Sequence, residues 1–152
     1  MGQLYLICVG KLKNKNYREI ESDFTKRMNP SLQVIEVKSC AENPDKESEV
    51  VLKKISDLSK KSKAKIILLT EDGEKYSSLK FSKYLEELMG QSNDIFFCIG
   101  GAAGHGEKLL ELADGKLSLS PLTFPHKLAR LIIVEQLYRA QTISSGHPYH
   151  NE

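Results

Sequence analysis

Short apolar segments alternate along this chain with longer segments in which apolar residues recur at helical spacing. The apolar segments, which we expect to form strands, are 4–9, 32–37, 64–70, 94–99 and 116–120. Most are apolar throughout, which is typical of strands buried on both faces. The alternation of such strands with helices predicts an α/β fold, in which a mostly parallel sheet is flanked by helices on both faces.

The segments between the strands have the spacing and the end signals of helices. We expect helices at 17–28, 50–58, 78–89, 107–113 and 126–143. The first should end before Pro30, because the residue that precedes a proline avoids the α region. Ser77 or Ser78 can cap the third helix. The polar stretch 38–46 is expected to be a loop, and residues 71–73 a turn.

Size and charge exclude several classes of protein. With 152 residues the chain is expected to form one domain, 1–152. Lys and Arg number 22 and Asp and Glu 20, so the formal charge is +2 and the chain is not a bulk polycation that binds nucleic acid by charge alone. The lysines of segment 60–65 are expected to form a solvated helix end or a local phosphate contact. No apolar stretch is long enough to span a membrane.

The cysteines favour a reducing, cytoplasmic environment. Cys8, Cys40 and Cys98 form no CxxC pair, so we expect neither a thiolate zinc site nor a dithiol redox motif. Cys8 and Cys98 lie in apolar segments, where buried, reduced thiols are expected. The N-terminus is expected to be a strand and not a signal peptide.

Segment 100–106 (GGAAGHG), which follows the expected strand 94–99, is rich in glycine. Ligands of parallel sheets bind beyond the carboxyl ends of the strands, so this segment is a candidate binding loop. Its glycines lack the GxGxxG spacing of a dinucleotide site. Gly101 and Gly106 have the first spacing of a phosphate-binding P-loop. However, Glu107-Lys108 follow, so the lysine is displaced and the hydroxyl is missing. We expect a backbone that approaches a ligand closely; a plain flexible turn is the alternative.

The segment 119–124 (LSPLTF) is a second candidate for a binding loop. Pro121 and Pro125 restrict the backbone and remove two N–H donors. A rigid apolar loop with exposed backbone groups suits a flat heterocycle, because side chains cover its faces while amides read its edge. The segment can also lead into the last helix, with Thr123 as the cap and Pro125 in the first turn.

Three of the four histidines, His126, His147 and His150, lie near the C-terminus. Zinc-ligand spacing such as HExxH is absent, so we expect no metal site. His126 and Arg130 are four residues apart on one helical face, and Lys127 and Arg130 are three apart, which predicts a small basic patch beside the binding loop. His147 and His150 either belong to a solvated tail or, with Tyr149, offer a stacking surface to an unpaired RNA base.

The last helix is apolar on more than one side. Its apolar residues are Leu128, Leu131, Ile132, Ile133, Val134, Leu137, Tyr138 and Ala140. Such a helix must be buried on two sides. Either a second copy of the chain covers it, or other helices of the same chain do.

Three segments carry a resemblance to a known family: FFCIGGAAG (96–104), LSLSPLTFPHKLAR (117–130) and EQLYRAQTISSGHPYH (135–150). They resemble the bacterial ribosomal RNA large subunit methyltransferase H family of the SPOUT superfamily, and the similarity spans the whole chain. The resemblance implies S-adenosylmethionine as methyl donor and a homodimer in the cytoplasm. The implied substrate is N3 of a pseudouridine in 23S ribosomal RNA, within the assembled ribosome. A C-terminal trefoil knot in the α/β fold is also implied.

The same resemblance implies roles for individual residues. The cofactor pocket takes in Leu69, Gly101, Leu119, Ser120, Pro121, Leu122, Thr123 and Phe124. The substrate side takes in His126, Arg139, Tyr149 and His150, with the tail reaching toward the pocket of a partner subunit. The imide nitrogen of the base is weakly acidic, so a base or a field that favours its anion would assist the transfer. Glu135 and Arg139 are four apart, and a simple ion pair between them is the alternative.

A function of a different class stays open at this point. The chain would then be a non-enzymatic ribosome-binding or assembly factor that keeps the shape of the pocket. Binding of S-adenosylmethionine separates the two, because a pure binder need not take up the cofactor. A phosphate-based nucleotide enzyme has no motif support.

Overall fold

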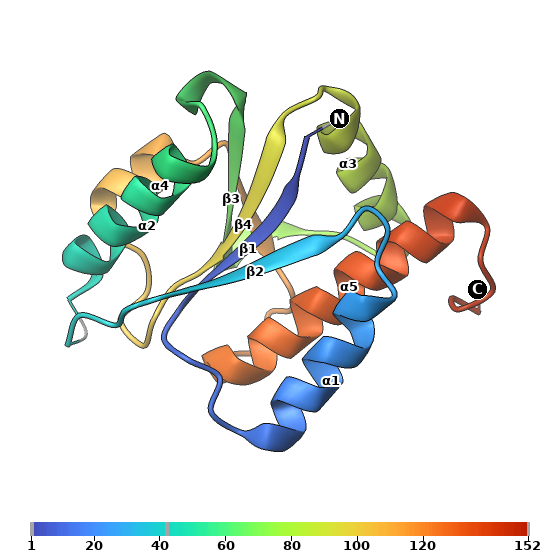
Figure 1. Ribbon diagram of the computed structural model, residues 1–152, viewed down its shortest axis with the longest axis horizontal. Helices are drawn as coiled ribbons and strands as arrows, with labels where there is room; N and C mark the ends of the chain where they lie inside the picture. Colours follow the sequence, from blue (N-terminus) through green and yellow to red (C-terminus); the bar gives the residue numbers. More distant parts are fainter. Residues whose placement is uncertain (1, 42, 152) are drawn as a thin grey trace.

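Five parallel strands form one sheet, in the order β2-β1-β4-β3-β5, in the part of the chain that the structure describes (Figure 1). The structure is a computed structural model and describes residues 2–41 and 43–151. The strands are β1 (Leu4–Val9), β2 (Leu32–Val37), β3 (Ala64–Lys75), β4 (Asp94–Ile99) and β5 (Gly115–Ser118). The predicted mostly parallel α/β sheet is therefore confirmed. The knot that the resemblance implies stays a prediction.

Helices cover the sheet on both faces (Figure 1). The helices are α1 (Lys15–Lys26), α2 (Pro44–Leu58), α3 (Ser78–Gly90), α4 (Glu107–Leu112) and α5 (His126–Ser145), and a 3₁₀ turn spans Lys61–Lys63. α1, α3 and α5 pack against one face, where Leu6 and Phe97 meet Ile133. α2 and α4 pack against the other, where Phe96 contacts the core around Val51. Every residue of β1 is buried, which explains why this strand is apolar throughout.

Short polar side chains determine where three helices begin. Asn14, Asn43 and Ser77 each accept a hydrogen bond from a backbone N–H in the first turn of α1, α2 and α3, respectively. Ser77 is thus the cap of the third helix. The prediction of a loop over 38–46 was wrong at its end, because α2 begins at Pro44 directly after its cap. Proline suits this position, since a first-turn N–H has no helical partner. Residue 42 of that stretch lies outside the described residues.

Residues 71–73 form no separate turn, contrary to the prediction, because β3 continues to Lys75. Its pairing with β5 shifts register between Leu69 and Glu74, which marks a bulge. A Cβ on Gly73 would lie 2.7 Å from the backbone of Leu117, so only glycine allows the two strands to approach this closely. The bulge follows Leu69, at the point where the pairing of β3 with β4 ends.

The apolar sides of α5 are covered mainly by its own chain. The helix packs between α1 and α3 and over β4, and Ile133, Val134 and Leu137 are completely buried. Leu128, at 38% exposure, is the large apolar side chain of α5 that stays open to solvent in the described part of the chain. The alternative of burial by other helices of the chain therefore accounts for most of this pattern.

A partly buried ion cluster joins α5 to α1 and β2. The Arg130 guanidinium donates to both carboxylate oxygens of Glu21, at 2.6 and 2.9 Å, and to Glu36 at 2.7 Å. The same Glu36 oxygen accepts the backbone N–H of Leu12 at 2.9 Å. Arg130 is only 7% exposed. The predicted basic patch of His126, Lys127 and Arg130 is thus corrected for Arg130, because two carboxylates neutralise its charge.

We predict that Arg130→Met lowers the free energy of unfolding by about 3 kcal/mol, because it leaves the mostly buried carboxylate of Glu21 and the partly exposed one of Glu36 without their cation. Urea denaturation monitored by circular dichroism measures the change. The control is Asp23→Ala, which removes an exposed ion pair with Arg27 and should cost less than about 1 kcal/mol. Equal losses in the two variants would contradict the structural importance of the cluster.

Candidate functional site

A cavity of about 600 Å³ lies beyond the carboxyl ends of β4 and β5 and beside the bulged part of β3. This volume and position are typical of small-molecule sites in parallel sheets. Three segments that are distant in sequence line it, together with the start of α5. The lining residues include Leu69, Glu71, Asp72, Ile99, Gly101, Gly104, His105, Leu119, Ser120, Leu122, Thr123, Phe124 and His126.

The residues predicted for the cofactor pocket come together in this cavity. Leu69, Gly101, Leu119, Ser120, Leu122, Thr123 and Phe124 all line it. Pro121 lies in the same loop without lining the cavity. His126, from the predicted substrate side, also lines the wall. Their roles toward a ligand stay predictions.

Side-chain hydroxyls stabilise the loop between β5 and α5. Ser118 donates to the carbonyl of Ser120 at 3.0 Å, and Ser120 accepts the N–H of Leu122 at 3.0 Å. Thr123 does not cap α5; its hydroxyl donates to Glu71 at 2.9 Å, across the cavity rim. The side chain of Leu122 is 71% exposed at this rim. The loop therefore presents an apolar surface on a backbone held by hydrogen bonds.

The glycine-rich loop after β4 closes on itself and rests on α2. The N–H of Gly104 donates to the carbonyl of Gly101 at 3.0 Å. The buried N–H of Gly106 donates to Ser48 Oγ at 2.7 Å. The hydroxyl of Ser48 thus anchors the end of this loop.

Glu47 is a buried carboxylate directly behind the glycine-rich loop. It is 2% exposed, and its Oε2 accepts hydrogen bonds from Ser39 Oγ at 3.0 Å and from the N–H of Cys40 at 2.9 Å. Its Oε1 has no hydrogen-bond partner among the described residues. A Cβ on Gly101 would lie 3.0 Å from this oxygen, so glycine is needed here for close packing. Sequence patterns did not indicate Glu47, because it looks like one more polar residue on a charged helix.

His105 was also not predicted as a site residue, although it lies in the glycine-rich segment. Its Nε2 is 3.0 Å from the carbonyl oxygen of Leu69, which can only accept, so Nε2 carries the proton. This bond links the loop after β4 to the end of the regular part of β3. Burial lowers the pKa of His105, so the neutral ring is favoured at the cavity wall.

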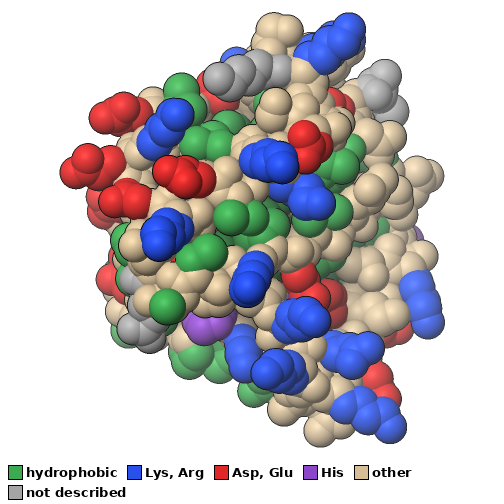
Figure 2. Space-filling model, turned by 60° about the vertical axis from the view of Figure 1, so that its left-hand side comes forward, with side chains coloured by type: hydrophobic (Ala, Val, Ile, Leu, Met, Phe, Trp, Pro, Cys, Tyr) green, Lys and Arg blue, Asp and Glu red, His purple; other side chains and the backbone are tan. Residues whose placement is uncertain are grey.

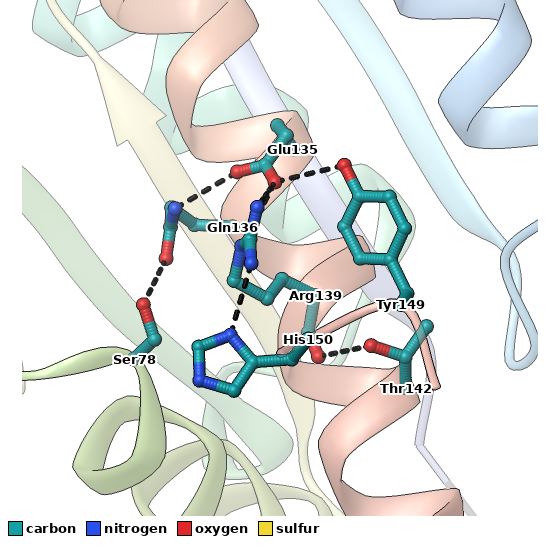
Figure 3. Close-up of polar contacts among 7 residues, drawn as sticks. All are labelled: Ser78, Glu135, Gln136, Arg139, Thr142, Tyr149 and His150. Atoms are coloured by element: carbon teal, nitrogen blue, oxygen red, sulfur yellow. Dashed lines mark hydrogen bonds and ion pairs between the residues drawn. The ribbon is translucent and has the colours of Figure 1, made fainter. Parts of the chain in front are cut away.

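Arg139, Tyr149 and His150 lie elsewhere, in what we call the Glu135 cluster: Glu135, Arg139, Tyr149 and His150 (Figure 3). Arg139 donates to Glu135 Oε1 at 2.6 and 2.9 Å, so the ion pair considered from sequence is present. Tyr149 donates its hydroxyl to the same oxygen at 3.0 Å. Arg139 Nη1 lies 2.9 Å from His150 Nδ1, which must accept because a guanidinium only donates. Burial raises the pKa of Tyr149, and its bond to Glu135 adds to the shift.

The Glu135 cluster and the cavity are at different positions along α5. His126 is the first residue of the helix, and Arg139 follows 13 residues later, which corresponds to about 20 Å at 1.5 Å per residue. The described part of one chain therefore brings His126 to the cavity and keeps the other three predicted residues away from it.

The remaining predictions concern the state of the cysteines, a metal site and a membrane-spanning segment. Cys8 and Cys98 are buried free thiols, as predicted, and burial raises the pKa of Cys8 to about 12. Across 2–41 and 43–151, His, Cys, Asp and Glu side chains form no group of three suited to a metal ion. No helix in these ranges has the length and apolar character needed to cross a membrane.

We predict that the free energy of unfolding falls as the pH is lowered from 8 to 5, in part because of His105. Its pKa is lower in the folded protein than in the unfolded chain, so the unfolded state binds more protons as the pH drops below about 6.5. Urea titrations across this range should show a shallower pH dependence for His105→Gln than for the unsubstituted protein. The control His147→Gln, in the exposed tail, should keep the original dependence. If the free energy of unfolding depended on pH equally in all three proteins, the role of His105 in this dependence would be contradicted.

Comparison with known proteins agrees with the geometry. A family model described as "Predicted SPOUT methyltransferase" matches residues 3–150. The chain is 42% identical over 151 residues to the Ribosomal RNA large subunit methyltransferase H of Synechococcus sp. (strain RCC307), covering 98% of this chain and 95% of that one. Proteins of the same name from Gluconacetobacter diazotrophicus and Flavobacterium johnsoniae are 38% and 35% identical, over 95% and 97% of this chain and 95% and 98% of their own. The chain therefore belongs to the SPOUT methyltransferase family.

Proposed function

We propose that this methyltransferase transfers the methyl group of S-adenosylmethionine to N3 of a pseudouridine in 23S ribosomal RNA of the large subunit, within the assembled ribosome. We further propose that it acts in the cytoplasm as a homodimer of single-domain chains, each spanning 1–152. The relatives named Ribosomal RNA large subunit methyltransferase H support the RNA substrate. The motifs in 96–104, 117–130 and 135–150 support the finer assignment of the base.

The convergence of Leu69, Gly101 and the loop 119–124 on one cavity is the observation that carries the proposal. S-adenosylmethionine has no phosphate, so a site for it needs no P-loop. Apolar side chains of the loop suit the faces of an adenine, and backbone groups suit its edge. Gly101 gives the close approach that a side chain would prevent. The carboxylates of Glu71 and Asp72 line the same cavity and suit the cationic end of the donor.

S-adenosylmethionine, when bound, supplies an electrophilic methyl group. The chain's own residues then have three tasks: to hold the donor, to orient the base and to favour loss of the imide proton. His126 lies at the cavity wall with an exposed ring, where it can accept a hydrogen bond from an entering base. The guanidinium of Arg139 offers a positive field that favours an imide anion. Tyr149 offers an aromatic face for stacking.

The homodimer is supported by the geometry of α5. The Glu135 cluster lies about 20 Å along the helix from His126, so its residues reach a cavity only if it belongs to another copy of the chain. Leu128 adds an exposed apolar contact on the same helix. In this arrangement one subunit holds the methyl donor, and the partner's tail helps to position the base.

We predict that ribosomes from a strain lacking this protein accept one methyl group per large subunit from S-adenosylmethionine when the protein is added, and that nucleoside mapping places it on N3 of a pseudouridine.

Gly101→Ala should weaken cofactor binding at least tenfold in calorimetry, because the new Cβ meets Glu47 and displaces the loop. Gly90→Ala is the matched control, since a Cβ there meets nothing within 4 Å. Binding to ribosomes with neither cofactor uptake nor methyl transfer would instead indicate an assembly factor.

We predict that two inactive variants restore activity when mixed. A cavity variant, Gly101→Val, and a tail variant, Tyr149→Ala with His150→Ala, should each methylate ribosomes poorly. Co-refolded in equal amounts, they form mixed dimers with one intact composite site, so about a quarter of the original activity should return if subunits pair at random. Addition of the two separate activities, without any gain on mixing, would show that the tail acts within its own chain or not at all.

A further inference from the structure

We propose that a row of cations beside the cavity binds the phosphates that flank the target nucleotide. This basic strip consists of Lys11, Lys13, Lys15, Arg18 and Lys127. The proposal rests on the proposed function, because it names the surface by which the same site holds its RNA. Sequence patterns indicated only Lys127, as part of the basic patch beside the binding loop, since the other four residues come from a segment more than 100 positions away.

The strip starts at the cavity and leads away from it. A small pocket bordered by Lys11, His126 and Lys127 shares His126 with the cavity wall. Beyond it, a groove of about 1070 Å³ runs between α1 and β2, with Lys11, Lys13, Lys15 and Arg18 among its lining residues. Figure 2 shows Lys and Arg side chains gathered in the lower part of one face, beside a histidine. A strand whose base enters the cavity would therefore continue directly over these cations.

The charges of the strip are available to a ligand. All five side chains are exposed, and within the described ranges none forms an ion pair with a carboxylate. The groove also contains Glu21 and Glu36, but Arg130 binds both of these carboxylates. Glu19 is the carboxylate of the groove lining that forms no ion pair within the described ranges. Cations outnumber free carboxylates at this surface, although the whole chain carries only +2.

The fold holds the strip in place. Leu12 is buried, and its N–H donates to Glu36, which in turn binds Arg130. The buried leucine anchors the loop, so the lysines on either side of it are fixed near the cavity instead of moving with a free loop. Preorganised cations lose less conformational entropy on binding than a flexible tail would.

The other lysine-rich segment, at 60–65, is badly placed for this task. β3 begins there, at Ala64, and reaches the cavity at Leu69, about 17 Å away at 3.3 Å per residue. Lys65 also lies 3.9 Å from Asp114. Of the two basic clusters, the strip is therefore the one that can contact RNA while a base occupies the cavity.

The test compares two triple variants that lose the same charge. The strip variant is Lys11→Gln, Lys13→Gln, Lys15→Gln, and the control is Lys53→Gln, Lys60→Gln, Lys63→Gln. We expect the strip variant to raise the KM for ribosomes at least tenfold, with kcat at saturation within a factor of about two. The slope of log affinity against log salt concentration should fall by about 2 to 3, since each lost phosphate contact removes roughly 0.7 to 0.9. Its calorimetric affinity for S-adenosylmethionine should not change.

The control variant should behave as the unsubstituted protein does. Unchanged KM and salt slope in the strip variant, or equal effects in both variants, would overturn the proposal. If the unsubstituted protein transfers no methyl group, the proposed function fails. Filter binding of the same three proteins to ribosomes then decides the strip separately, because the expected loss of affinity and of salt slope does not depend on turnover.

Discussion

The ion cluster of Arg130 with Glu21 and Glu36 connects α5, whose start borders the cavity, to the elements beside it. Through it α5 is joined to α1 and β2, and the shared Glu36 oxygen also holds the loop after β1. Replacing a buried ion pair with apolar residues is often neutral or stabilising, so net stability is a poor explanation for its presence. A guanidinium that binds two carboxylates has a defined direction, whereas an apolar contact can slide. We interpret the cluster as the device that sets the position of α5, and with it His126, against the sheet.

The cavity itself is built from irregular parts of the structure. β3 bulges where it passes β5, the loop after β4 needs glycine, and Glu47 keeps one buried oxygen without a partner in the described region. An unsatisfied buried acceptor costs about 1 to 3 kcal/mol. Such local costs accumulate at functional sites, where the surrounding regular structure compensates for them. Here the compensation comes from a sheet whose strands β1 and β4 are buried along almost their whole length.

The two ends of α5 have separate chemistry. Its first turn borders the cavity, and its last turns carry the Glu135 cluster, where Arg139 also lies over the ring of Tyr149 at 4.9 Å. Within one chain the cluster is an ordered network that fixes the tail against the helix (Figure 3). In the proposed homodimer, a second subunit would give that network a cavity to act on. The basic strip then supplies positive charge for RNA, mainly from the loop after β1 and the start of α1, although the net charge of the whole chain is low.

The sequence by itself determined the strands and helices, the α/β class and the family. Apolar periodicity and caps such as Ser77 are local signals, because they depend on residues within one or two turns of each other. They located β1, β2 and β4 at their observed bounds, and the motif of segment 117–130 indicated the loop that borders the cavity.

Only the tertiary structure decided which charges are free. Arg130 and Lys127 look alike in the sequence, yet one is neutralised by carboxylates from α1 and β2, and the other is exposed beside the cavity. The tertiary structure also decided that Glu47 is buried and that Arg139 is far from His126. Burial and distance depend on contacts between segments, which local sequence patterns do not contain.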